Sequence, residues 1–417
     1  MVHSMVNLNS SQSILDTSSE NLTITVWQLD SSDTYNRVAI IDEIESLHVI
    51  YKYVQPSTFT LQVAYSAELV QLLTLDSMIT IHSPQTLGIE QTECFLITYR
   101  KIKTTTNGTS TITVTGSNPL IWLKDRAILT VNSGYSDTPA ENIAKDYVVN
   151  NLGPGATPAR QYPNFEVQAS QNLPGTLTFM NTENYPSVYE LTVDVLSAVN
   201  LGQTITFNPN TQTFLYQVFE GTNHGITQNE NLQVLFSPSI DNMMGDTFTE
   251  STATYKNTAY VYGQVNNTEE CTIVEGNYSY NYYKNISSTE SETVGNFTGL
   301  HRREVAVQAD LSNTTVTLTS SNYESIFQTI GENSLITKAQ SKNIIGSIKL
   351  SSDSAFKFNQ DFQVGDTVTY LNKEWGVQMD VVIAEVRLQY SPKGFTTQLS
   401  LGFPLPTLED KFGITLS

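Results

Sequence analysis

The sequence is poor in several residue types on which catalysis and cross-linked folds depend. Only 2 of its 417 residues are cysteine, 5 are histidine and 3 are tryptophan. Cys94 and Cys271 both lie in apolar, strand-like stretches, so the pattern predicts two buried, unpaired thiols rather than a disulfide framework. The histidines show no i, i+4 pair and no neighbouring Cys or Asp at ligand spacing, and the sequence therefore predicts no zinc site.

Basic side chains are also scarce. Lys and Arg number 21 against 41 Asp and Glu, which gives a formal net charge of −20. Because affinity for nucleic acids comes largely from Lys and Arg at the phosphates, this balance argues against a protein that holds DNA or RNA tightly. Long apolar runs are missing, and residues 1–21 contain no basic cluster followed by an apolar core, so we predict neither stable membrane insertion nor a secretory signal.

The motifs of common enzymes are missing too. There is no Gly-x-Ser-x-Gly elbow, and the glycines at 153–155 lack the lysine of a phosphate-binding loop. Glu43 with Glu45, and Glu269 with Glu270, are the best candidates for paired carboxylates, yet the abundance of acids favours solvent-facing charge. We interpret the cluster His-Arg-Arg-Glu at 301–304 as an ion-pair network at a boundary. We predict no catalytic residue, cofactor or metal.

What the sequence does contain is a strand pattern that occurs twice. The first copy covers residues 75–120 and the second covers residues 364–405. In both copies the closing strand is bracketed by glycines eight residues apart, which are Gly108 with Gly116 and Gly394 with Gly402. We therefore expect two related small β-barrels on one chain.

The region between the two copies carries helix signals. Thr138-Pro-Ala-Glu141 and the Ser-x-x-Glu run at 187–190 both have the spacing of a capping box at a helix start. Gly153 and Gly202 end these two helices, and a hairpin follows over 204–219. Helix-like spacing returns over 322–341.

The long apolar strand at 377–390 changes phase in its middle. Its apolar residues first occupy the odd positions and then the even ones: Val377, Met379, Val381, Ile383, Ala384, Val386, Leu388 and Tyr390. A phase switch inside one strand predicts a bulge or a sharp bend there.

Together these patterns predict a mainly β, α+β fold with two related tube-like β-barrel domains, an inserted α+β module and a small helical segment. The expected divisions are a flexible arm (1–21), the first barrel (22–125), the α+β module (126–245), return strands with a Tyr/Asn-rich loop that contribute to the second barrel (246–310), the helical segment (311–349), the second barrel (350–408) and a C-terminal tail (409–417).

Several sequence blocks follow one another in the order and spacing of a known family. They are the runs at 35–46, 59–63, 255–263, 299–304, 364–368 and 402–404. The chain resembles the siphovirus ReqiPepy6 Gp37-like tail proteins of long-tailed phages, and the resemblance extends over residues 30–405.

This resemblance implies a structural virion protein at the phage tail tip, similar to the trimeric baseplate hub of contractile-tailed phages and to the N-terminal part of tail-associated Tal proteins. By analogy, a homotrimer with pseudo-sixfold barrels docks on the hexameric distal tail protein and caps or lines the DNA ejection channel. DNA would pass without specific binding. The tape measure protein and receptor-binding or tail-fibre proteins would be further partners, and assembly would take place in the host cytoplasm. Arg100 and Arg387, at matching repeat positions, are candidates for ion pairs in the ring.

Two other function classes fit parts of the sequence. The tyrosine-rich run at 278–283 would suit a binder of a host receptor or cell-wall carbohydrate. A peptidoglycan-degrading enzyme would need two acids brought together across a cleft, which spacing alone does not show.

Overall fold

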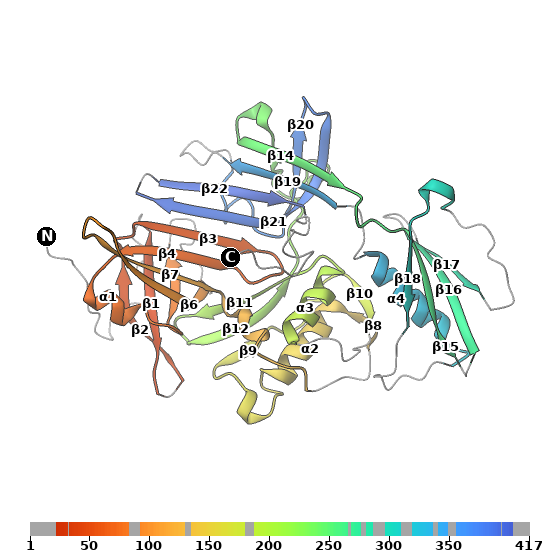
Figure 1. The fold of residues 1–417 in the computed structure, drawn as a ribbon, viewed down its shortest axis with the longest axis horizontal. Helices are drawn as coiled ribbons and strands as arrows, with labels where there is room; N and C mark the ends of the chain where they lie inside the picture. Colours follow the sequence, from red (N-terminus) through yellow and green to blue (C-terminus); the bar gives the residue numbers. More distant parts are fainter. Residues whose placement is uncertain are drawn as a thin grey trace.

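The protein is described here by a computed structural model in which residues 22–31, 33–82, 92–129, 135–179, 187–265, 268–276, 281–286, 297–309, 319–336, 341–348, 356–392 and 394–402 are placed. These residues are mainly β with a few short helices (Figure 1), which confirms the predicted fold class. The described strands form no closed barrel, so the two barrels expected from the sequence are absent as closed structures within one chain. The expected arm at 1–21 and tail at 409–417 lie outside the described residues.

One large sheet dominates the described structure. Its main path consists of β14 (Met243–Ser251), β19 (Ser341–Ile348), β22 (Gly394–Leu401), β21 (Val377–Ser391), β3 (Ser46–Lys52), β4 (Thr58–Ala64), β7 (Ser110–Ser117), β6 (Thr92–Thr104), β11 (Gly202–Asn208), β12 (Thr213–Phe219) and β9 (Phe165–Val167). Side branches are β1 (Thr23–Leu29), β2 (Tyr35–Ile41), β5 (Met78–His82), β13 (Leu235–Phe236) and β20 (Thr367–Asn372). Segments far apart in the sequence therefore lie side by side in one layer (Figure 1).

The repeated sequence pattern forms two antiparallel meanders of the same connectivity, β5-β6-β7 and β20-β21-β22. The middle strand of each meander is bulged, at Thr98 in β6 and at Ala384 in β21. The bulge predicted from the phase switch is thereby confirmed. One of the repeated glycines has a direct packing reason, because a Cβ on Gly116 would clash with the carbonyl oxygen of Leu96.

Both repeats share one hydrophobic core on the covered side of the sheet. Side chains from β1, β3, β4, β6 and β7 form a single cluster with those of β20, β21 and β22. The short helix α1 (Ala67–Leu72) also contributes Leu69 to this core. The two copies of the pattern thus pack on one shared core rather than forming two separate domains.

The α+β region lies against β1, β5 and the start of β6, on the side away from the shared core. It contains α2 (Ala140–Asn151) and α3 (Val188–Ser197), the pair β8 (Tyr135–Pro139) and β10 (Thr176–Phe179), and the short turns η1 (Pro119–Leu123) and η2 (Pro158–Arg160). Trp27 and Phe207 meet edge to face with ring centroids 5.2 Å apart, which anchors this second core on β1.

Both predicted helices are present, but neither capping box forms. Pro139 and Ser187 occupy the N-cap positions, and neither makes a side-chain capping hydrogen bond. At the first helix the reason is that Glu141 turns into the protein instead of back toward the cap. A tertiary contact has therefore replaced the local one.

A third α+β unit has its own sheet and core. Strands β17 (Asn281–Ile286), β16 (Thr268–Gly276), β15 (Thr258–Val265) and β18 (Glu304–Gln308) pair in that order, and α4 (Tyr323–Ile336) packs on them. The strands that flank this unit in sequence, β14 and β19, pair with each other and join the large sheet. The segments expected at 246–310 and 311–349 are therefore distributed differently between the two sheets, since long-range pairing and not sequence order places β14 and β19.

Glu141 is fully buried and is surrounded by donors. Its carboxylate accepts hydrogen bonds from Lys145 Nζ, 2.9 Å away, from Ser170 Oγ, and from the backbone N–H groups of Gln171 and Leu173. Burial by itself raises the pKa of Glu141, but these four donors outweigh burial and lower the pKa to about 2. The carboxylate thus fastens the loop after β9 to α2.

We expect Glu141→Gln to destabilise the protein by about 3 kcal/mol, because the substitution leaves Lys145 buried without its anion. The folded pKa lies below the unfolded value of 4.5, so this contribution is complete above pH 4.5 and is lost as the pH falls toward 2. Urea unfolding at pH 7 and pH 3 measures both effects. Glu166→Gln, at an exposed position of β9, is the matched control, and equal losses in the two variants would contradict this role.

Candidate functional site at the junction of the repeats

The half of the sheet that contains the first repeat is joined to the second repeat by direct pairing of β3 with β21. The register places Lys52 opposite Glu385, Val49 opposite Leu388 and Leu47 opposite Tyr390. The N-terminal half of β21 pairs with β20 along the same edge, and the bulge at Ala384 separates the two halves. One strand therefore belongs to both repeats, and its bulge lets it change partner.

Tyr53, the residue that follows β3, locks this junction. Its backbone N–H donates to the carbonyl of Ala384, and its hydroxyl donates to the carbonyl of Asn200 at 2.8 Å. A Cβ on either Gly202 or Gly365 would clash with its ring, so both glycines are needed for the ring to fit. Burial raises the pKa of Tyr53 to about 12. This side chain, which extends from the end of β3, contacts both the α+β region and Gly365 before β20.

The edge of β6 that corresponds to this joint carries no strand among the described residues. Ile97 and Ile383 occupy equivalent places, because each exchanges backbone hydrogen bonds with the turn before β5 or β20 in the same way. Counting on from them, Ile102 corresponds to Leu388. Leu388 is 7% exposed beneath β3, whereas Ile102 is 44% exposed. The exposed apolar side chain marks the place where a covering strand is missing.

Strand β14 presents the complementary edge. Phe248 lies opposite Ile344, which lies opposite Leu401, which lies opposite Ile383. In the first half of the sheet, Val49 of β3 and Ile97 of β6 are connected by the same number of strand pairings. Phe248 in the second half therefore corresponds to Val49 in the first. Among the described strands, β14 pairs only with β19. The chain therefore contains one such strand pairing, that of β3 with β21. It also has two open edges, on β14 and on β6, that match the two strands of this pairing.

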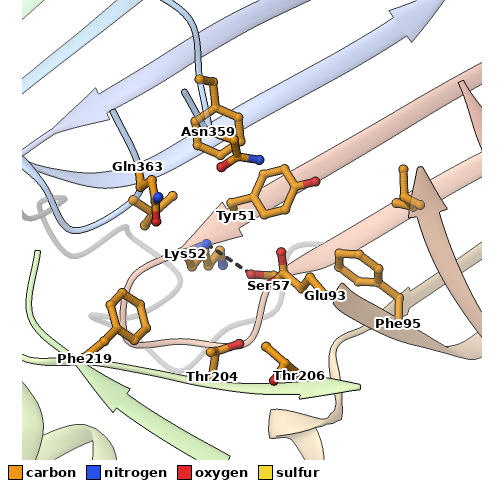
Figure 2. A pocket seen from close by; sticks show the side chains of 13 residues that line it. Tyr51, Lys52, Ser57, Glu93, Phe95, Thr204, Thr206, Phe219, Asn359 and Gln363 are labelled. Carbon is orange, nitrogen blue, oxygen red and sulfur yellow. Dashed lines mark hydrogen bonds between the residues drawn. The ribbon is translucent and has the colours of Figure 1, made fainter. Parts of the chain in front are cut away.

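A cavity of about 200 Å³ lies beside the joint (Figure 2). Its walls come from the end of β3, the start of β6, the hairpin β11-β12 and the segment before β20, and the labelled side chains point inward from all four. The lining residues are Tyr51, Lys52, Ser57, Ile81, Glu93, Phe95, Thr204, Thr206, Phe219, Phe358, Asn359, Gln363 and Val364.

Glu93 is the acid of this cavity. Burial raises its pKa to about 7, although hydrogen bonds from the side chains of Ser57 and Asn118 act in the opposite direction. Burial, and then the nearby Glu93 carboxyl, raise the pKa of Tyr51. The cavity can therefore take up or release one proton near neutral pH.

The cavity does not have the groups of a hydrolytic centre. Among the described residues that line it, Glu93 is the only carboxyl, and none is a histidine or cysteine that could activate a nucleophile. Across the described ranges, no three His, Cys, Asp or Glu side chains gather closely enough to hold a metal ion. Within these ranges we also find no helix both long and apolar enough to cross a membrane.

Arg100 and Arg387 do not occupy equivalent positions, which corrects the expectation from the sequence. Arg100 lies opposite the buried Val114 on the core face, where it donates to the carbonyl oxygens of Val70 and Leu73. Arg387 lies on the open face, 2.5 Å from Glu385. The residue equivalent to Arg387 is Lys101, because Lys101 follows Ile97 and the bulge in β6 by the same number of residues as Arg387 follows Ile383 and the bulge in β21.

The charged cluster at 301–304 does form an ion-pair network, but inside the third unit. Arg302 contacts Glu275 at 3.0 Å and Glu304 at 2.5 Å and donates to the hydroxyl of Tyr260. His301 is exposed, and its carbonyl accepts a hydrogen bond from Asn257. Of the tyrosine-rich run, 278–280 lie outside the described residues and 281–283 belong to the strand β17.

The remaining sequence candidates lie apart from the cavity. Glu43 and Glu45 lie in the turn between β2 and β3 rather than on one strand face, and Glu45 accepts a hydrogen bond from Gln62. Glu270 lies on β16, and the side chain of Glu269 lies outside the described residues. Cys94 is a buried thiol as predicted, whereas Cys271 is only half-buried.

The residues that matter at the junction were not singled out by sequence reasoning. Glu93 stands one residue before an apolar run and looks like ordinary surface charge. Its partners Ser57 and Asn118 come from other segments, so no short motif connects them. Tyr53 likewise follows a strand with no local signal beyond its size.

Comparison with protein families gives a match over nearly the whole chain. The model of the siphovirus ReqiPepy6 Gp37-like proteins matches residues 23–403. The chain belongs to this family. It is therefore a structural protein of the phage tail, which places it in the virion.

Solved structures show the same fold at low sequence identity. A tail protein from Neisseria meningitidis MC58 is similar with a TM-score of 0.50 and 12% identity, covering 92% of this chain and 97% of that one. The 43 kDa tail protein of prophage MuSo2 from Shewanella oneidensis has a TM-score of 0.50 and 10% identity, covering 91% and 98%. No curated protein matches the chain.

We expect Glu93→Gln to make the stability of the protein less sensitive to a rise in pH from 4.5 to 7. The folded pKa of about 7 exceeds the unfolded value of 4.5, so the wild type gains stability from Glu93 below pH 4.5 and loses it up to pH 7. Relative to the wild type, Glu93→Gln gains up to about 3 kcal/mol between pH 4.5 and pH 8.

Thermal unfolding of both proteins at several pH values measures this difference. Glu374→Gln, at an exposed turn position, is the matched control and leaves the pH profile unchanged. Parallel pH profiles for the wild type and Glu93→Gln would show that Glu93 has an ordinary pKa.

Proposed function

We propose that the chain forms the trimeric hub of a phage tail tip. The observation that carries this proposal is the β3–β21 joint, together with the two open edges that match it. Repeating the joint between chains places β14 of one subunit against β6 of the next. The internal register then sets Phe248 opposite Ile102, Thr249 opposite Lys101 and Glu250 opposite Arg100.

Such pairing resolves two features of the single chain. It covers Ile102 with Phe248, as Val49 covers Leu388 inside the chain. It also brings the Glu250 carboxylate to the edge of β6, the strand that carries Arg100, Lys101 and Lys103. Opposite charges on facing strands favour this register over a slipped one.

Three chains close the sheet. Each chain supplies eight strands, two from each repeat and two that adjoin each repeat in the sheet, which are β14, β19, β22 and β21 and then β3, β4, β7 and β6. A ring of 24 strands spaced about 4.8 Å apart has a circumference of about 115 Å and a diameter of at least about 37 Å. A barrel of this size leaves an open channel rather than a packed interior.

In this assembly three chains present six similar repeats. This number matches the six subunits of a hexameric ring above them. We propose that the repeats dock on the distal tail protein and line or cap the path of the ejected DNA. Contacts with the tape measure protein and with receptor-binding or fibre proteins would use surfaces outside the ring. Assembly would take place in the host cytoplasm. The proposal assigns the chain no enzymatic activity.

The test is a substitution at the open edge. We expect Ile102→Glu to leave the single chain folded, because this side chain is already 44% exposed. The buried carboxylate would prevent trimer formation. Light scattering coupled to size-exclusion chromatography should give three times the 46.3 kDa chain mass for the wild type and a single chain mass for the variant.

Leu129→Glu provides the control, since Leu129 is 68% exposed but lies away from both edges. Leu129→Glu should remain trimeric. A wild-type protein that stays monomeric at high concentration and in the presence of the distal tail protein would rule out the hub. A trimer unaffected by Ile102→Glu would rule out this interface.

A further inference from the structure

The cavity beside the β3–β21 pairing contains a carboxyl group without a cation. Glu93 receives hydrogen bonds from the side chains of Ser57 and Asn118, both of which are uncharged. Lys52 also lines the cavity, but it forms no ion pair with Glu93 among the described residues. Burial of the carboxyl favours its protonated form, since an unpaired charge is costly in apolar surroundings. A cation that entered the cavity would reverse this preference.

The apolar walls of the cavity suit an alkylammonium group. Aromatic rings contribute to these walls from four separate segments of the chain, and they belong to Tyr51, Phe95, Phe219 and Phe358. Figure 2 shows the first three of these pointing inward, on the same cavity as Glu93. Aromatic rings attract ammonium cations through their negative faces, and they also pack against aliphatic carbons. The walls therefore favour a cation that carries an aliphatic stem.

The cavity also supplies hydrogen-bond acceptors. A primary ammonium group has three N–H donors and no acceptor, so it needs several oxygen atoms around it. Besides Glu93, the lining includes the hydroxyl groups of Thr204 and Thr206 and the amide side chains of Asn359 and Gln363. Each of these side chains has an oxygen atom that can accept a hydrogen bond. One carboxylate with neutral acceptors beyond it matches a ligand with a single positive charge.

The size of the cavity limits the ligand. Its volume of about 200 Å³ lies below the roughly 300–1,000 Å³ of pockets that hold drug-sized molecules. A cavity of about 150 Å³ can hold benzene, so a group of about six heavy atoms fits here. Glu93 is half-buried and Gln363 is exposed, which means that the cavity can be reached from solvent. A short amine fits these limits, whereas a nucleotide or a sugar chain does not.

We propose that this cavity binds a primary ammonium group on a short aliphatic stem, with Glu93 as its counter-ion. Free small amines and the side chain of a lysine share this chemistry. Every lining residue comes from one chain, so binding does not depend on the trimer. A bound ammonium group would contact β3, β6, the hairpin β11-β12 and the segment before β20 together, and would thereby stabilise the junction between them.

The test is calorimetric titration of the full chain with n-butylammonium. Binding should be about tenfold weaker at pH 6 than at pH 8, because the pKa of Glu93 is about 7 and the carboxylate is the form that binds. At pH 6 each ligand should displace about one proton, which titrations in two buffers of different ionisation enthalpy measure. Tyr51 and Lys52 on β3 are the other titratable groups of the described lining, and the hairpin and the segment before β20 contribute none.

Two variants and a neutral ligand provide the controls. Glu93→Gln should bind n-butylammonium at least tenfold more weakly than the wild type at pH 8 and release no proton. Glu374→Gln makes the same change in charge at an exposed turn position and should bind as the wild type does. n-Butanol has the same number of heavy atoms without the charge, and it should bind at least tenfold more weakly than n-butylammonium at pH 8.

A pentapeptide of glycines with one central lysine distinguishes the two sources of the ammonium group. If the peptide binds with the same dependence on pH and on Glu93, the occupant is a lysine of a partner segment. If n-butylammonium binds and the peptide does not, the occupant is a free amine. Either result supports the site.

Three results would overturn the proposed site. They are no binding of n-butylammonium at pH 8, equal binding by the wild type and Glu93→Gln, and binding of n-butanol that matches n-butylammonium at both pH values. The last of these would show a merely apolar cavity. The mass of the protein is measured in the same samples, so failure of the ammonium site is separable from failure of the hub.

Discussion

The pairing of β3 with β21 is the constraint on which the rest of the structure depends. It joins segments more than 300 residues apart and brings both repeats over one core. It also explains the bulge at Ala384, because β21 must leave β20 before it can meet β3. Tyr53 fits beneath this crossing only because glycines surround its ring.

Two buried glutamates near this framework show how environment decides ionisation. Glu141 meets an ammonium group, a hydroxyl and backbone donors, and its pKa falls to about 2. Glu93 faces a cavity with fewer donors, and its pKa rises to about 7. Burial acts in the same direction on both, and at Glu141 the four donors, one of them the Lys145 ammonium group, outweigh it. The first acid fixes a loop, whereas the second makes the junction sensitive to pH.

The same contrast applies to the strand edges. An edge with an exposed apolar side chain invites pairing with the wrong partner, and lysines on such an edge oppose that pairing. Here Ile102 and its neighbours repeat the environment of Leu388, which is covered inside the chain. The proposed trimer would give such an edge a use in assembly.

Local patterns in the sequence were enough for part of this picture. The two copies at 75–120 and 364–405, the phase switch at Ile383 and Ala384, and both central helices follow from alternation, glycine spacing and helix signals within short windows. The family resemblance also came from blocks in sequence. These features depend on neighbours a few residues apart, which a sequence displays directly.

Only the tertiary structure decided which strands pair and how each residue is buried. Barrels expected to close on themselves open into a shared sheet, β14 and β19 return to the second repeat around an inserted unit, and Arg100 faces the core. Glu93 and Glu141 look alike in sequence yet ionise in opposite directions. The physical reason is that register, burial and pKa are set by residues tens or hundreds of positions away, whose proximity no local pattern encodes.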